Sequence, residues 1–118
     1  MKTLVIGAST NPERYSYKAI NSLLNHKHEV VAVGNKTGTI SGIEIHKEKK
    51  LFADVDTVTL YLSAKNQLEF YDYILELKPK RVIFNPGTEN PEFYAILEKN
   101  NIQVEVACTL VLLATNQY

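Results

Sequence analysis

The chain lacks the features that mark secreted, membrane-spanning or nucleic-acid-binding proteins. Its 118 residues contain one cysteine, Cys108, so an internal disulfide cannot form. Thirteen basic residues balance thirteen acidic ones, and this balance gives no general attraction to nucleic acid or to an anionic membrane. No charged leader followed by an apolar stretch precedes the first apolar run, and no run is long enough to span a bilayer. We therefore expect a cytoplasmic protein that binds neither nucleic acid nor membranes, and in which any cationic site is local.

The composition is that of a folded domain. With 45% hydrophobic and 22% charged residues, the chain can bury one substantial core. Its length leaves no room for a second core, and no repeat, linker or low-complexity tract divides it. We expect a single domain over residues 1–118.

Short runs rich in β-branched residues alternate along the chain with amphipathic segments and turn residues. This alternation is typical of an α/β fold built on a mostly parallel sheet. Each run is mainly apolar, as expected for a parallel strand that is covered on both faces. Five strands are predicted: Thr3–Gly7, Glu29–Gly34, Thr57–Leu62, Arg81–Phe84 and Ile102–Glu105.

Three segments between these strands carry apolar residues at helical spacing. Ser16, Ser63 and Asn90 are predicted to cap these helices, and Pro91 follows Asn90 at the first helical position, where a missing N–H costs nothing. After the last strand, Ala107–Ala114 is apolar nearly all round and suits a terminal helix packed on the sheet. The apolar residues of the three segments are Tyr17, Ile20, Leu23 and Leu24, then Leu68, Tyr71 and Leu75, then Phe93, Ile96 and Leu97.

These elements predict a doubly wound, three-layer Rossmann-like fold. Because crossovers between parallel strands are right-handed, we expect a five-stranded parallel sheet of order 3-2-1-4-5. In such a sheet the ligand crevice lies where the strand order reverses, which here is at the carboxyl ends of strands one and four.

The turn after the first strand is the strongest functional signal in the sequence. Thr3–Ile6 leads into Gly7-Ala8-Ser9-Thr10-Asn11-Pro12, and a helix is predicted shortly after. A strand, a small-residue turn and a helix N-terminus in this order bring free backbone N–H groups and the positive end of a helix dipole together, which favours phosphate. The turn is not the dinucleotide fingerprint, because Ser9 and Pro12 stand where its second and third glycines belong.

Two further loops are expected at the same edge of the sheet. The loop after the second strand, Gly34-Asn35-Lys36-Thr37-Gly38, contains no acid that could accept from the ribose of NAD. Lys36 stands there instead, and a lysine favours a nucleotide with an extra phosphate, such as coenzyme A with its 3′-phosphate or NADP with its 2′-phosphate. In the loop after the fourth strand, 85–90, proline and glycine fix the backbone and asparagine side chains are free to hydrogen-bond.

Together these segments resemble the small stand-alone CoA-binding domains, a Rossmann-like family similar to the CoA-binding domain of the succinyl-CoA synthetase α subunit. The resemblance runs from Lys2 to about Leu113. It is carried by the Gly-Ala-Ser turn, Asn11-Pro12, Ser16-Tyr17-Lys18, the Lys36 loop closed by Gly42, Val55-Asp56-Thr57-Val58, Asn85-Pro86-Gly87 with Glu92, and Cys108. It implies that coenzyme A or an acyl-CoA binds with its diphosphate on the first turn.

The resemblance also implies which residues surround the ligand. The first turn and the start of the helix would hold the phosphates, Lys36 would lie near the 3′-phosphate or the adenosine, and the loop after the fourth strand would follow the pantetheine arm. The expected ligand-binding residues are Gly7, Ala8, Ser9, Thr10, Ser16, Tyr17, Gly34, Asn35, Lys36, Tyr61, Asn85, Pro86 and Gly87.

Several of these residues also have a purely structural interpretation. Gly7 and Gly87 fit ordinary turn glycines, and Lys36 fits a solvated loop lysine. Cys108 has apolar neighbours and is predicted to be a buried, inert cysteine. His26 and His28 fall at a predicted helix C-terminus, and no histidine has the spacing of a metal ligand, so no metal site is assigned.

Nothing in the three loops has the composition of a catalytic site. No histidine falls in them, their serines have no recognisable base, and Glu92 in a helix's first turn is expected to complement the dipole. No catalytic residue is therefore assigned. Two classes of function stay open: a CoA or acyl-CoA binding module, acting with or without an unidentified protein partner, and a small NADP-dependent or other nucleotide-using enzyme that a partner completes.

Overall fold

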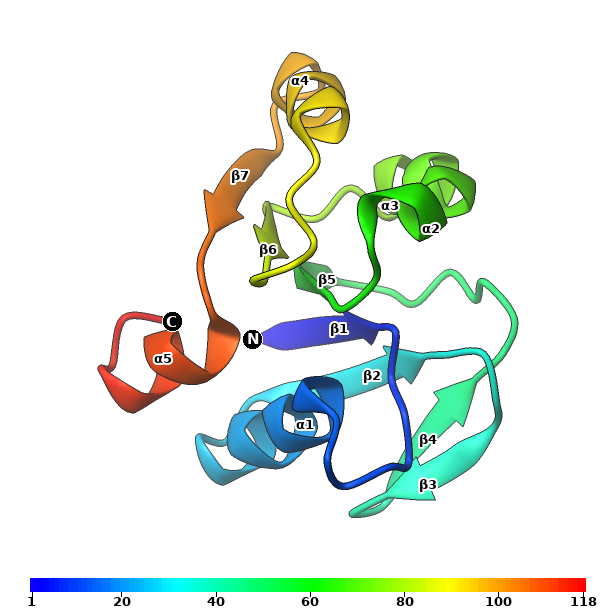
Figure 1. Cartoon of the computed structure of the whole chain (residues 1–118), viewed down its shortest axis with the longest axis vertical. Coiled ribbons are helices and arrows are strands. Elements are labelled where there is room, and N and C mark those ends of the chain that lie inside the picture. Colours follow the sequence, from blue (N-terminus) through cyan, green and yellow to red (C-terminus); the bar gives the residue numbers. More distant parts are fainter.

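Seven strands form one sheet in the computed structural model, which describes residues 1–118 (Figure 1). The strands are β1 (Lys2–Ile6), β2 (Glu29–Val33), β3 (Gly38–Ile40), β4 (Ile43–His46), β5 (Val55–Leu60), β6 (Arg81–Phe84) and β7 (Gln103–Val106). Their order across the sheet is β3-β4-β2-β1-β5-β6-β7. Every neighbouring pair is parallel except β3 and β4, which form an antiparallel hairpin at one edge.

The α/β class and the five expected strands are confirmed, but the predicted five-stranded sheet of order 3-2-1-4-5 is wrong. The third expected strand, β5, pairs directly with β1, and the place outside β2 belongs to β4. Ile43-Glu44-Ile45-His46 alternates apolar and polar residues, which is typical of a strand with one covered face, whereas the sequence analysis relied on continuous apolar runs and so missed the hairpin. The strand order therefore reverses between β1 and β5, and the crevice lies at the carboxyl ends of these two strands.

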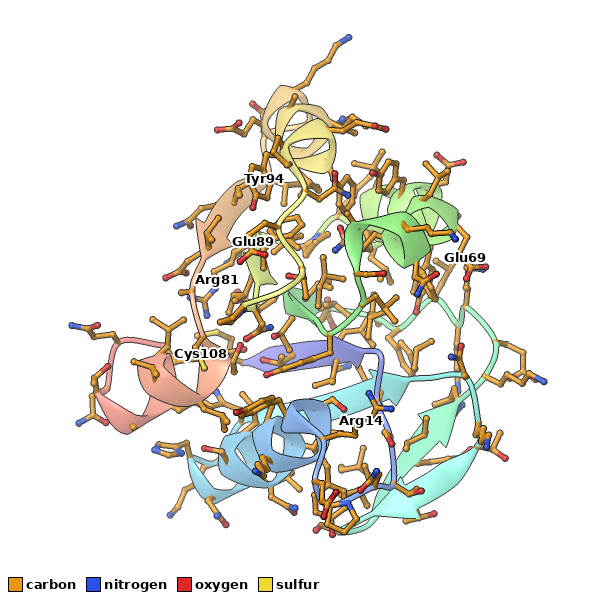
Figure 2. The ribbon with its side chains drawn as sticks, in the orientation of Figure 1. Arg14, Glu69, Arg81, Glu89, Tyr94 and Cys108 are labelled. Carbon is orange, nitrogen blue, oxygen red and sulfur yellow. The ribbon has the colours of Figure 1, made fainter.

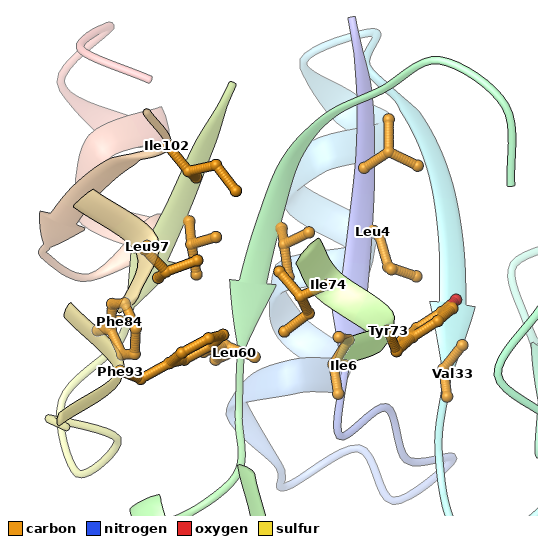
Figure 3. Packing of buried hydrophobic residues seen from close by; sticks show 13 residues of the cluster. Leu4, Ile6, Val33, Leu60, Tyr73, Ile74, Phe84, Phe93, Leu97 and Ile102 are labelled. Carbon is orange, nitrogen blue, oxygen red and sulfur yellow. The ribbon is translucent and has the colours of Figure 1, made fainter. Parts of the chain in front are cut away.

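Helices cover both faces of the sheet. On one face, α1 (Tyr15–Asn25) and α5 (Thr109–Ala114) pack against a cluster that includes Val5, Ile20 and Leu113. On the other face, α3 (Tyr71–Leu77) and α4 (Pro91–Lys99) pack against the larger cluster, in which Phe93 contributes a fully buried ring (Figure 3). The short α2 (Ala64–Gln67) and the 3₁₀ turn η1 (Leu68–Phe70) lead from β5 into α3. None of the helices has the length and apolar character needed to cross a membrane.

One of the three expected helix caps is confirmed. The Asn90 side chain accepts a hydrogen bond from the N–H of Phe93 at 3.3 Å, and Pro91 occupies the first turn of α4. Ser63 precedes α2 but makes no capping hydrogen bond. Ser16 is not a cap, because α1 begins one residue earlier and Arg14 holds the cap position.

The first turn is seated on the end of β2. The backbone N–H groups of Gly7 and Ala8 both donate to the carbonyl of Val33, each at 3.0 Å. The N–H of Gly34 donates to the backbone carbonyl of His46 at 2.9 Å. A Cβ atom at Gly34 would lie 2.3 Å from the carbonyl oxygen of Ala8. Glycine at position 34 is therefore what allows the two loops to approach this closely.

The segment that returns from β4 to β5 is held by Tyr73 of α3. The buried Tyr73 hydroxyl donates to the backbone carbonyl of Lys50 at 2.5 Å. Burial raises the pKa of Tyr73 to about 12, because the phenolate would lose its hydration.

We expect Gly34→Ala to destabilise the protein by about 1–3 kcal/mol, the usual cost of forcing extra volume into a packed region. The backbone of Ala8 has to move away, so ligand affinity at the first turn should fall as well. Urea unfolding measures the first effect. Asn35→Ala, at the exposed neighbouring position, is the control and should leave the midpoint unchanged; equal midpoints for wild type and Gly34→Ala would contradict the close approach.

We expect the free energy of unfolding to fall as the pH rises above about 10, the ordinary tyrosine value. The pKa of Tyr73 is raised in the folded state, so its contribution is complete below the unfolded-state pKa and is lost as the pH rises through about 12. Urea melts of wild type and Tyr73→Phe between neutral and alkaline pH test this. The variant should lose less stability over that range, and parallel curves would contradict the assignment.

Candidate functional site

A cleft of ≈ 660 Å³ opens at the carboxyl ends of β1 and β5, where the strand order reverses. Eight of the expected ligand-binding residues line it: Gly7, Ala8, Ser9, Thr10, Ser16, Asn35, Lys36 and Tyr61. Six lining residues were not predicted: Glu13, Arg14, Tyr15, Leu62, Ser63 and Asn66. The last three follow β5, so the incorrect strand order kept them out of the predicted crevice.

The first turn and the start of α1 present unbonded backbone donors to this cleft. The N–H groups of Ser9 and Thr10 in the turn donate to no other group of the chain. The same holds for the N–H groups of Tyr15, Ser16 and Tyr17, since these lie in the first turn of α1 and no residue before them accepts. Such groups attract an anion through their hydrogens and through the helix dipole.

Ser16 adds a side-chain donor at this helix end. Its side chain lines the cleft, the residue is only 3% exposed, and its hydroxyl makes no hydrogen bond within the chain. The hydroxyl oxygen itself is accessible, because the Tyr61 hydroxyl is the only buried side-chain polar atom without a partner. The Ser16 hydroxyl is therefore available to hydrogen-bond a group in the cleft. The first turn of α1 also contains no acidic residue, and no side chain caps it.

The charged residues of the cleft are Glu13, Arg14 and Lys36. Neither cation forms an ion pair with a carboxylate of the chain, although four pairs between a lysine or arginine and a carboxylate occur elsewhere. Arg14 is the last residue of the loop that connects β1 to α1 (Figure 2), and Lys36 lies in the loop after β2. The cleft thus has cations on two walls in a chain with no net charge.

Tyr61 forms the wall of the cleft after β5. Its ring packs against the cluster beneath α1 and α5, and its hydroxyl is buried with no hydrogen-bond partner. Burial raises the pKa of Tyr61 to about 12, and the neighbouring hydroxyls of Thr109 and Thr59 oppose the rise. These two hydroxyls bond each other at 2.8 Å, and neither reaches Tyr61 with hydrogen-bond geometry. Tyr61 is therefore a neutral, protonated side chain at any ordinary pH.

The remaining expected residues do not line the cleft. Tyr17 packs against the cluster beneath α1, and Gly34 supports the first turn from behind. Pro86 and Gly87 are exposed in the loop after β6, one strand beyond the cleft. Their expected contact with the pantetheine arm stays a prediction.

The polar atoms of the Asn85 side chain form hydrogen bonds within the chain. Its amide nitrogen donates to the Thr59 hydroxyl at 2.6 Å and to the Leu60 carbonyl at 2.9 Å, and its carbonyl accepts from the N–H of Thr109 at 2.8 Å. Asn85 is 2% exposed. The side chain thus joins β5, β6 and the start of α5, and is not free for a ligand as the sequence analysis expected.

The other residues singled out from the sequence lie outside the cleft. Cys108 is half-buried at the start of α5, not buried as predicted (Figure 2). His26 ends α1 and bonds the Ser22 carbonyl at 2.8 Å, while burial lowers the pKa of His28. Nowhere do three His, Cys, Asp or Glu side chains gather as metal ligands would. The cleft itself is lined by neither histidine nor cysteine.

Comparisons with known proteins identify a matching family. Residues 1–114 match the family described as "CoA binding domain". No curated protein matches the chain.

Solved structures with the same fold include proteins without a described activity. One, described as an uncharacterized protein, is 50% identical with a TM-score of 0.97 and covers 99% of this chain and 97% of its own. A conserved hypothetical protein from Pyrococcus furiosus is 28% identical with a TM-score of 0.82, covering 93% of this chain and 97% of its own.

A third structure is a much longer enzyme, the dinucleotide-forming acetyl-coenzyme A synthetase 1 of Ca. Korarchaeum cryptofilum, in complex with phosphate and ADP. It is 16% identical with a TM-score of 0.73, and the match covers 87% of this chain but 25% of the synthetase. At this identity the likeness concerns the fold alone. The family match over residues 1–114, in contrast, spans nearly the whole chain, and the protein belongs to the CoA-binding domain family.

Proposed function

We propose that this protein binds coenzyme A or an acyl-CoA in the cleft between the ends of β1 and β5, as a binding module without a catalytic group of its own. The observation that carries the proposal is the start of α1. Tyr15 and Ser16, whose backbone N–H groups are unbonded, line the cleft there together with the unbonded Ser16 hydroxyl, in a chain of the CoA-binding domain family. A phosphate group satisfies both kinds of donor at once.

The shape of the cleft supports an extended ligand. Its lining runs from Lys36 after β2, past the first turn, to Leu62 and Ser63 after β5. In the proposed arrangement the adenosine end with its 3′-phosphate lies by Lys36, the diphosphate lies on the first turn, and the pantetheine arm passes Tyr61 toward the loop after β6. This direction leads the arm away from the charged residues Glu13, Arg14 and Lys36 and past Tyr61 and Leu62.

Several features favour CoA over a nicotinamide dinucleotide. The loop after β2 carries Lys36 and no acid, so nothing there accepts from an unsubstituted ribose. In the first turn, Ser9 and Pro12 replace two glycines of the dinucleotide fingerprint. A ligand that carries a terminal phosphate, in contrast, meets the cation Lys36 at this end of the cleft.

We expect CoA to raise the thermal midpoint of the protein more than NAD or NADP does. A ligand present at 100 times its dissociation constant adds about 2.7 kcal/mol to stability, whereas a ligand that does not bind adds nothing. Thermal melts with equal concentrations of CoA, acetyl-CoA, NADP and NAD measure this. Equal shifts with all four, or no shift with CoA, would sink the proposal, and a shift with NADP alone would favour the enzyme alternative.

We expect Lys36→Ala to weaken CoA by about 1–3 kcal/mol, the range for a charge-assisted hydrogen bond, and to leave dephospho-CoA almost unchanged. The two ligands differ only in the 3′-phosphate, so calorimetric titration of both isolates the contact. Lys99→Ala, at the end of α4 and outside the cleft, is the control. An equal loss for both ligands would move Lys36 away from the terminal phosphate.

A further inference from the structure

The two arginines of this chain have opposite surroundings. Arg81 is half-buried and fully engaged: it pairs with Glu105 at 2.8 Å, donates to Thr57 at 3.1 Å and stacks on Tyr118 at 4.5 Å from the ring centroid. Arg14 is exposed, lines the cleft, and its guanidinium makes no ion pair, hydrogen bond or aromatic contact with the chain. A guanidinium with five donors at the mouth of an anion site is free to bind a ligand.

The backbone of Arg14 is fixed even though its side chain is free. Its N–H donates to the Asn11 carbonyl at 3.0 Å, and its own carbonyl accepts from Lys18 at 3.3 Å. The residue is extended, with φ −77° and ψ 142°, and it immediately precedes the unbonded N–H groups of α1. The side chain therefore starts from a defined point between the first turn and the helix (Figure 2), and the residue lines the cleft.

We propose that Arg14 recognises the diphosphate of the ligand through a two-point contact of its guanidinium; this inference rests on the proposed function. A diphosphate offers oxygens on two neighbouring phosphorus atoms, and the planar fork of an arginine matches such a pair. A lysine supplies only a point charge, which suits the single terminal phosphate near Lys36. Arg14 thus binds the diphosphate, and Lys36 binds the terminal phosphate of the same ligand.

The neighbouring acid, Glu13, offsets the positive charge of Arg14. Glu13 lines the same cleft, so the carboxylate of residue 13 and the guanidinium of residue 14 contribute opposite charges at one place. The net electrostatic attraction from this pair is small at a distance. Arg14 consequently acts through direct hydrogen bonds to the ligand and not through a general positive field.

The test is calorimetric titration of wild type, Arg14→Gln and Arg14→Lys with CoA, dephospho-CoA and pantetheine. Arg14→Gln should weaken CoA and dephospho-CoA by the same factor, about tenfold or more, because both carry the diphosphate. Arg14→Lys should lose nearly as much affinity as Arg14→Gln, because lysine keeps the positive charge but lacks the planar guanidinium that donates to two oxygens at once. Pantetheine, which has no phosphate, should bind all three proteins alike.

Matched variants complete the design. Lys99→Gln removes a cation outside the cleft and should bind CoA as wild type does, while urea melts check that each variant folds. Binding of CoA by Arg14→Lys at wild-type affinity would overturn the two-point contact. A loss of affinity in Arg14→Gln that is confined to CoA and spares dephospho-CoA would overturn it too. So would a gain of CoA affinity in Glu13→Gln as large as the loss in Arg14→Gln, since charge alone would then explain both. If wild type itself binds no CoA, the proposed function fails; if wild type binds and Arg14→Gln binds equally, only this inference fails.

Discussion

The site depends on one shared acceptor, the carbonyl of Val33 at the end of β2. Two consecutive N–H groups, those of Gly7 and Ala8, donate to it at 3.0 Å each. This pair of hydrogen bonds turns the chain sharply as it leaves β1 and aims the following residues across the ends of the strands. Because Gly34 has no side chain, the turn can lie directly on β2, and the unbonded donors of the turn and of α1 then face the same cleft.

The larger features of the fold follow from patterns that the sequence carries plainly. Each of the five apolar runs is a strand because parallel strands are buried on both faces, and Asn90-Pro91 starts a helix because the asparagine accepts from the first turn. The turn after β1 lies in the cleft as expected from a strand, small residues and a helix in succession. These features depend on neighbours within a few residues, which a sequence displays directly.

The incorrect predictions concern features that depend on contacts between residues far apart in the sequence or on the exact start of a helix. The β3–β4 hairpin has three- and four-residue strands, and its place outside β2 depends on pairing that no local pattern records. Ser16, which the sequence predicts as the cap of α1, lies inside the helix and lines the cleft, and Arg14 holds the cap position. Asn85 looks like a free loop asparagine, and only the position of Thr59 and Thr109 reveals that its amide is occupied.

The β3–β4 hairpin also determines how the sheet meets its surroundings. A sheet edge presents unpaired N–H and C=O groups that can template pairing with another chain and so promote aggregation. On one side this edge is a strand of only three residues, Gly38–Ile40, running antiparallel to its neighbour. On the other side the edge strand β7 has four residues, and Glu105 within it is held in an ion pair with Arg81. Short outer strands at both ends give a mostly parallel sheet little template for edge-to-edge growth, even though its interior strands are strongly apolar.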